Sequence, residues 1–154
     1  MPGAESANRT LTSAEPLFAS RPRRIPALTI AYHPDVRRAG AVAILDGLAR
    51  GAEVMLSRLE PDFVPAGGGQ GRPLADPFLS RTPIVLKNAD GGVGISVPPG
   101  VQLEVDALPV SGGRYVDPEE LERGTVLTVA ERMVLFLHLV SWPRPEAAPK
   151  LGLV

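Results

Sequence analysis

Short apolar or alternating segments recur along the middle of the chain, and each is followed by a turn signal. The intervening stretches contain Gly, Pro and Asp, and DGG at 90–92 is a strong β-hairpin signal. Many short strands with such punctuation favour a sandwich or a barrel. The pattern predicts strands at 27–32, 42–45, 53–58, 83–87, 93–97, 101–105, 125–129 and 133–140.

Few segments indicate helix. DPEE at 117–120 combines an N-cap, a first-turn proline and early acidic residues, and Gly124 closes the segment, so we expect one short helical turn. Residues 43–50 are also compatible with a helix. The run MVLFLHLV at 133–140 is ambiguous, but its β-branched and aromatic residues and its lack of a cap favour a buried strand. The connection over 59–79 exceeds the usual loop length, which is typical of functional or mobile loops.

The 154 residues suit one domain with tails. Residues 1–24 are rich in Pro, Ser, Ala and Arg without a period, so we expect a disordered leader. Residues 141–154 carry three prolines and two consecutive alanines, which indicates a linker. The folded part is therefore predicted at 25–140.

Composition excludes several classes of function. The formal net charge of -1 argues against a general nucleic-acid or membrane-surface role. No apolar run approaches the roughly 20 residues of a membrane helix. The absence of cysteine excludes a disulfide scaffold and a thiolate metal site and favours the cytoplasm. With only two histidines, His33 and His138, a His-rich metal centre is not available, and we expect no metal or cofactor.

Hydroxyls and guanidinium groups gather around the long connection. Ser57 and Arg58 end one predicted strand, and Ser80, Arg81 and Thr82 precede the next. A guanidinium fork with hydroxyl donors at strand ends is what binding of a phosphate dianion needs. The alternative is that the arginines are ordinary surface residues and the hydroxyls satisfy the loop backbone.

Two catalytic patterns are poorly supported. A hydrolase would need Ser80 or Ser57 as nucleophile and His33 or His138 as base, but the chain has no nucleophile elbow, and His138 lies in an apolar run. The glycine-rich stretch GGGQGRP at 67–73 lacks the Lys-Ser/Thr ending of a phosphate-binding loop and no helix is expected after it. We therefore predict that the protein is not an enzyme.

The order of these features resembles the forkhead-associated (FHA) domain over residues 27–140. The resemblance rests on a strand ending in Arg58, a long loop, Ser80-Arg81, and the closing hairpins with LERGTVLTVAERMVLFL at 121–137. It implies an all-β fold, an FHA-like, eleven-stranded β-sandwich of two antiparallel sheets with short helical turns. It also implies that loops at one end read phosphothreonine peptides.

By this resemblance, Arg58 matches the arginine that contacts phosphate. Ser80 matches the phosphate-binding serine, and Arg81 matches the arginine that often follows it. Ser57 and Thr82 flank these positions and complete the predicted phosphopeptide-binding set. Leu121 to Gly124, followed by Thr125, resembles the family's Leu-x-x-Gly-Asp step.

Other positions depart from the family pattern. Ser57 replaces the motif glycine, and Pro83 stands at the structural histidine. Asp106-Ala107 stands where Asn-Gly is expected, and Val101 falls near the asparagine that holds the peptide backbone. The alternative function is therefore a degenerate FHA module that binds a protein without phosphate.

A second resemblance lies at the chain end. Leu151-Gly152-Leu153-Val154, after the proline-rich linker, resembles the opening of the AAA+ ATPase module of NtrC-type sigma-54-dependent transcription activators. It implies that this chain is the regulatory (sensor) part of a bacterial cytoplasmic regulator. The implied partners are a phosphothreonine protein from a Ser/Thr kinase pathway and the AAA+ module of the same full-length chain, with no membrane and no direct nucleic-acid contact.

Overall fold

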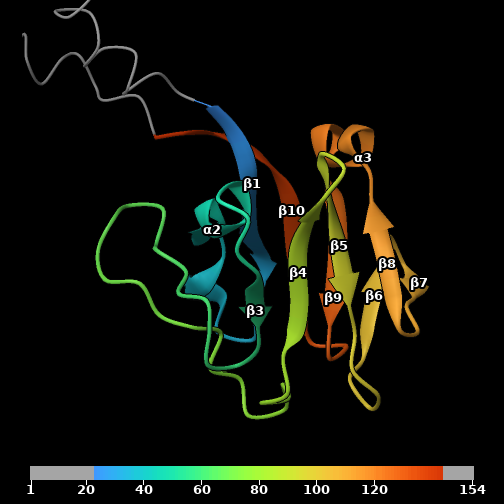
Figure 1. Ribbon diagram of the computed structural model, residues 1–154. Helices are drawn as coiled ribbons and strands as arrows, with labels where there is room; N and C mark the ends of the chain where they lie inside the picture. Colours follow the sequence, from blue (N-terminus) through green and yellow to red (C-terminus); the bar gives the residue numbers. More distant parts are fainter. Residues whose placement is uncertain (1–22, 144–154) are drawn as a thin grey trace, which may run out of the picture. The chain divides into compact units, whose positions relative to one another are not determined.

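Residues 23–143 are described by a computed structural model, in which ten strands form two antiparallel sheets of a β-sandwich (Figure 1). The strand order is β2-β1-β10-β9-β6-β7 in the six-stranded sheet and β3-β4-β5-β8 in the four-stranded sheet. The predicted sandwich of two antiparallel sheets is thus confirmed. The strands are β1 (Arg23–Tyr32), β2 (Val42–Ile44), β3 (Val54–Leu56), β4 (Ile84–Ala89), β5 (Gly92–Ser96), β6 (Leu103–Val105), β7 (Leu108–Pro109), β8 (Gly113–Val116), β9 (Thr125–Val129) and β10 (Met133–Trp142).

The core lies between the sheets, because alternate side chains of each strand point inward. β9 and β10 show this most clearly, with every second residue from Thr125 to Val129 and from Met133 to Leu137 buried. The run 133–140, ambiguous in the sequence, is therefore a strand, as expected. The fully buried core side chains include Leu28, Leu56, Ile84, Leu86, Val93, Leu127, Val129 and Leu135.

Local hydrogen bonds and backbone angles explain the predicted turn at 90–92 and the predicted helix start at 117. Asp90 and Gly91 have φ of 46° and 80°, and they form a two-residue turn because Ala89 pairs with Gly92. This confirms the expected hairpin between β4 and β5. The short helix α3 (Pro118–Arg123) begins with a capping box: the Asp117 carboxylate accepts from the Glu120 N–H at 2.8 Å, and the Glu120 carboxylate accepts from the Asp117 N–H at 3.0 Å.

Two further helical segments are short. Of the stretch 43–50, only α2 (Asp46–Ala49) is helical, since β2 takes the residues before it. A 3-10 turn, η1 (Val36–Arg38), follows β1. No helix within residues 23–143 has the length and apolar character needed to cross a membrane.

Two strands were missed in the sequence, and others differ in their bounds. β7 has two exposed residues, and β8 (GRYV) buries only Val116, so neither shows a readable alternation. The described residues form ten strands, whereas the resemblance implies eleven. β1 begins two residues before the predicted folded part, 25–140, and β10 ends two residues after it. Residues 25–140 form one compact unit; the rest of the predicted leader and linker, with the segment 151–154, lies outside the described residues.

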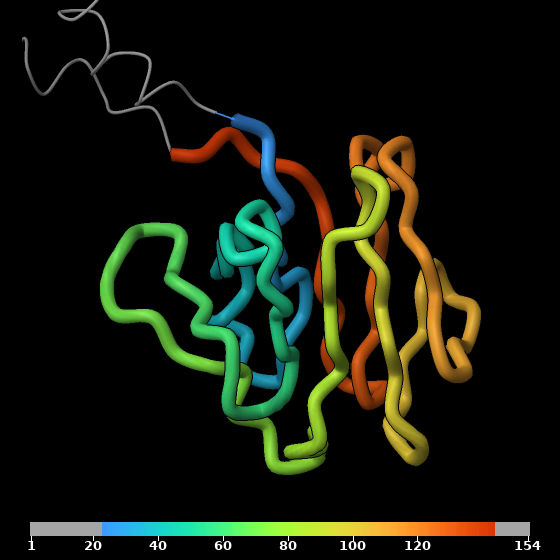
Figure 2. Tube along the Cα trace, in the orientation of Figure 1, coloured from blue at the N-terminus to red at the C-terminus, as the bar shows by residue number. Residues whose placement is uncertain are grey.

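One end of the sandwich gathers the loops that concern function. The segment leading into β4, the β5–β6 loop and the β9–β10 turn all lie at the lower end in Figure 1, and the tube in Figure 2 shows the same grouping. α3 and the β4–β5 turn lie at the other end. The long connection over 57–83 is held by isolated bridges, in which Val42 pairs with Val64 and Phe63 pairs with Arg72.

Candidate anion-binding site

The backbone brings Arg58 and Ser80 together. β3 ends at Leu56, and the Arg58 N–H donates to the Ser80 carbonyl at 3.5 Å. The Arg58 carbonyl accepts from the Ala75 N–H at 3.0 Å. Arg58 is thus flanked by both ends of the segment 75–80. Residues that are 22 positions apart in the sequence are therefore adjacent at the loop end.

Ser80 keeps a hydroxyl proton available to a ligand. Its Oγ accepts from the Thr82 N–H at 2.9 Å, so the hydroxyl orientation is restricted while its own hydrogen can still be donated. Arg81 and Thr82 are exposed. Within residues 23–143, the Arg81 guanidinium makes no hydrogen bond or ion pair. Ser80, Arg81 and Thr82 therefore present donors to solvent from one short loop.

The Arg58 guanidinium is only partly used by the protein. One of its N–H groups, on Nη1, donates to the Pro77 carbonyl at 3.3 Å. A guanidinium has five N–H donors, so four have no partner among the described residues. The Pro77 contact orients the side chain across the loop and leaves its charge without a carboxylate.

Ser57 differs from the other predicted residues, because it is buried, with 3% of its surface exposed. Its hydroxyl accepts from the Leu59 N–H at 3.1 Å, and its own N–H donates to the Glu60 carbonyl at 2.8 Å. These bonds turn the chain away from β3, which is why the strand is shorter than the predicted 53–58. The structure therefore places Ser57 in the turn that supports Arg58.

Sequence reasoning missed a second guanidinium at this end. Arg132, in the β9–β10 turn, makes three hydrogen bonds of 3.0–3.1 Å with the Asp76 carboxylate. Its guanidinium also lies 4.5 Å from the centroid of the Phe78 ring. Asp76 accepts from the Phe78 N–H at 2.8 Å as well. The segment 76–78 thus contacts Arg132 and, through Pro77, Arg58.

Asp76 is the buried anchor of this arrangement, with only 4% of its surface exposed. Burial by itself disfavours the carboxylate, but the hydrogen bonds from Arg132 and from the Phe78 N–H outweigh it and hold the pKa of Asp76 below its ordinary value. The carboxylate stays ionised and holds the loop before β4 against the β9–β10 turn. The Asp-Pro pair at 76–77 is a local turn signal that could have been noticed, whereas nothing local predicts its pairing with Arg132.

Of the positions that depart from the FHA pattern, Pro83, Val101 and Ala107 have no hydrogen-bonding side chain, and Asp106 uses its carboxylate within the domain. Pro83 directly precedes β4. Val101, in the β5–β6 loop, packs against the core, and its N–H donates to the Pro98 carbonyl at 3.2 Å. Asp106 and Ala107, with φ of 50° and 71°, form the turn between β6 and β7. The Asp106 carboxylate accepts from the Val126 N–H at 3.0 Å.

Neither histidine pairs with a candidate serine. The buried His33 accepts from the Asp35 N–H at Nδ1 (2.9 Å), so its Nε2–H donates to the Leu74 carbonyl at 3.0 Å. His138 Nε2 lies 2.7 Å from the Thr29 hydroxyl, and burial lowers the pKa of His138. Residues 67–73 form a surface loop that no helix follows, and its three consecutive glycines have open space around them.

The described residues contain no group of three or more His, Asp or Glu side chains that could hold a metal ion. No model of a known protein family matches the chain. No curated protein matches it either.

Proposed function

We propose that this chain is a phosphothreonine-peptide-binding FHA domain that acts as the regulatory sensor of a sigma-54-dependent transcription activator. The observation that supports it is the pairing of Arg58 with Ser80 at the loop end of a β-sandwich. These two positions were proposed from their place at strand ends and from the motif resemblance, and the backbone hydrogen bond between them lies at the end where peptide binding is expected.

The binding chemistry follows from the available donors. Phosphothreonine carries a charge of about -1.5 to -2 and three acceptor oxygens. Within residues 23–143, Arg58 has N–H groups without a partner and the Arg81 guanidinium has none of its donors bonded, while the Ser80 hydroxyl supplies a directional donor. Charge-assisted hydrogen bonds of this kind are each worth about 1.5–3 kcal/mol. The mechanism is recognition without a chemical step.

In the full-length regulator, peptide binding would bias assembly of the AAA+ module or its engagement of the polymerase. This part of the proposal rests on the resemblance of residues 151–154 and on their place after a proline-rich linker. Under this proposal, the protein acts in the bacterial cytoplasm and responds to a Ser/Thr kinase.

The alternative, a degenerate FHA module that binds without phosphate, is favoured by a specific observation. Two large apolar side chains next to the site are unusually open to solvent: Phe78 is 71% exposed and Leu59 is 63% exposed. Both flank the Arg58 position in the loop end, where Val101 and Pro83 replace the family's polar side chains. Apolar contacts of this kind would bind a protein surface whether or not it is phosphorylated.

The two proposals are separated by nitrogen-15 NMR titration of the chain with a degenerate phosphothreonine peptide library and with its unphosphorylated twin. Sensor function predicts shifts at Arg58, Ser80 and Arg81 with the phosphorylated set alone. Equal shifts with both sets would replace it with the phosphate-independent module. The absence of shifts with either set would refute both.

A further inference from the structure

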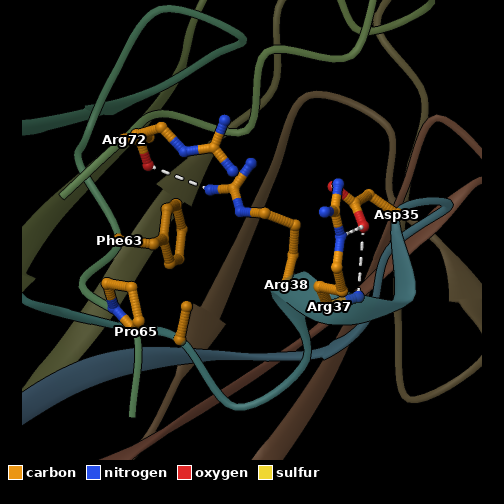
Figure 3. A pocket seen from close by; sticks show the side chains of 7 residues that line it. Asp35, Arg37, Arg38, Phe63, Pro65 and Arg72 are labelled. Carbon is orange, nitrogen blue, oxygen red and sulfur yellow. Dashed lines mark hydrogen bonds and ion pairs between the residues drawn. The ribbon is translucent and has the colours of Figure 1, made fainter. Parts of the chain in front are cut away.

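A second guanidinium cluster lines a cleft that shares no residue with the Arg58–Ser80 site. The cleft has a volume of about 380 Å³ and lies between the loop after β1 and the long connection. Figure 3 shows Arg37 turned toward Asp35, and the guanidinium groups of Arg38 and Arg72 close together near the Phe63 ring. The lining residues are Asp35, Arg37, Arg38, Ala41, Phe63, Pro65 and Arg72.

Arg38 is a buried charge that makes no ion pair with a carboxylate among residues 23–143. It is only 7% exposed, and its guanidinium donates to the carbonyls of Arg72 (3.1 Å), Pro73 (3.0 Å) and Leu74 (3.5 Å). These three bonds leave two of its five N–H donors without a partner among the described residues. Burial, together with the nearby charge of Arg72, lowers the pKa of Arg38. An anion in the cleft would offset both effects, because an opposite charge stabilises the charged guanidinium.

The one carboxylate of the cleft, Asp35, attracts Arg38 only at a distance and makes its ion pair with Arg37. Asp35 is occupied by Arg37, whose Nε and Nη2 donate to its two oxygens at 3.0 and 3.1 Å. The hydrogen bond from the Arg37 side chain is the main reason that the pKa of Asp35 falls to about 2. Three guanidinium groups and one carboxylate leave the lining with a formal charge of +2.

A purely structural role explains only part of this cluster. Arg38 fixes the loop carbonyls of 72–74, and a buried guanidinium can serve that purpose alone. Arg72 is different: it is exposed, and its side chain makes no hydrogen bond or ion pair within residues 23–143. It lies next to a like charge, and within residues 23–143 its side chain makes no hydrogen bond that would explain this position.

From these contacts we infer that the cleft is a binding site for a phosphate monoester with an apolar body, held by Arg38 and Arg72. The dianion matches the charge of +2, and guanidinium groups bind phosphate oxygens with directional hydrogen bonds. Ala41, Phe63 and Pro65 give the cleft an apolar side. The volume exceeds that of a phosphate group alone, so there is room for an attached organic group. Its source is either a free organophosphate or a phosphorylated side chain.

The test is an NMR titration of the chain with phenyl phosphate, with benzyl alcohol as the uncharged control. The amides of Ala41, Phe63 and Arg72 report on the cleft, whereas those of Arg58 and Ser80 report on the other site. The variant Arg72→Gln removes an exposed, unpartnered charge and should fold normally. Lys87→Gln is the matched control, since it removes an equal charge from an exposed position on β4.

We expect saturable shifts of the cleft amides with phenyl phosphate and none with benzyl alcohol. Arg72→Gln should weaken the affinity about tenfold, and Lys87→Gln should leave it unchanged. Binding should also weaken below about pH 6, where the phosphate loses its second charge. Cleft shifts with phosphothreonine peptides as well would identify a phosphorylated side chain as the source; shifts with phenyl phosphate alone would identify a small organophosphate.

Two results would overturn the inference. One is the absence of saturable shifts at the cleft amides, whatever happens at Arg58 and Ser80. The other is an equal effect of Arg72→Gln and Lys87→Gln on the affinity for phenyl phosphate, which would mean that positive charge anywhere on the protein attracts the anion. Because the two sites have separate reporter amides, the titration can refute binding in the cleft without refuting the proposed phosphothreonine site. It can also refute the phosphothreonine site without refuting binding in the cleft.

Discussion

Replacing Asp76 by asparagine removes the buried carboxylate that links the loop before β4 to the β9–β10 turn. The amide oxygen can still accept from the Phe78 N–H, but the charge that pairs with Arg132 is lost. Removing one partner of a fully buried ion pair costs about 3–5 kcal/mol. The Arg132 side chain is 36% exposed, so water can solvate it after the change. We therefore expect a loss of about 2 kcal/mol in the free energy of unfolding.

The assay is urea unfolding followed by circular dichroism. With a slope of about 2 kcal/mol per molar, this loss lowers the midpoint by about 1 M. Asp90→Asn is the matched control, because Asp90 is an exposed turn residue at φ 46°, where asparagine is equally tolerated. The control should leave the midpoint unchanged.

The pH dependence gives the sharper test. The folded-state pKa of Asp76 lies below its unfolded value of 3.8, so its stabilising contribution is complete above that value. It is lost as the pH falls through the folded pKa. The difference between wild type and Asp76→Asn should be constant from pH 7 to about pH 5 and shrink below about pH 4. A variant as stable as wild type, or a difference that grows in acid, would refute the role assigned to this ion pair.

Two further predictions concern the sandwich itself. Gly124 has a φ of 93°, and a Cβ there would overlap the Phe136 ring, so Gly124→Ala should destabilise the fold by about 2 kcal/mol or more. Gly51 has a φ of 85° but open space around it, so Gly51→Ala should cost only about 1 kcal/mol. Urea unfolding midpoints compare the two variants, and equal losses would contradict the steric argument. Burial lowers the pKa of His138 in the folded state, so wild type should lose stability as the pH falls from 6.5 toward that lowered pKa. In thermal unfolding scans, His138→Gln should remove this pH dependence of stability. A pH dependence that persists in the variant would assign it to another group.

Local chemistry explains which elements the sequence could predict. The Asp90-Gly91 turn and the Asp117 capping box depend on neighbouring residues, so their signals are complete within a few positions. β9 and β10 both begin at the predicted residues, and β10 was predicted from its β-branched and aromatic side chains. β7 and β8 are short strands with mostly solvent-facing side chains, and pairing with neighbours, not their composition, makes them strands.

The candidate site shows the same division. Arg58 and Ser80 were proposed together because both stand at ends of predicted strands and because the motif resemblance relates them, and the Arg58 N–H to Ser80 carbonyl bond joins them in the structure. Arg132 and Arg38 were missed because their partners lie 56 and at least 34 residues away in the sequence. Ser57 was assigned to the binding surface from its position beside Arg58, but burial depends on the turn that it makes with Glu60.

The most direct test of phosphothreonine recognition is the dissociation constant of one phosphothreonine peptide, selected from the library, and of its unphosphorylated twin. Fluorescence anisotropy would be measured with wild type, Arg58→Gln and the control Lys87→Gln. Glutamine keeps a polar side chain but removes the charge and most of the N–H donors of the Arg58 guanidinium, including the one that bonds the Pro77 carbonyl. We predict that the phosphopeptide binds wild type and Lys87→Gln alike, and Arg58→Gln about tenfold more weakly. Equal affinity of wild type for the two peptides, or an unchanged affinity in Arg58→Gln, would contradict recognition of phosphate at this site.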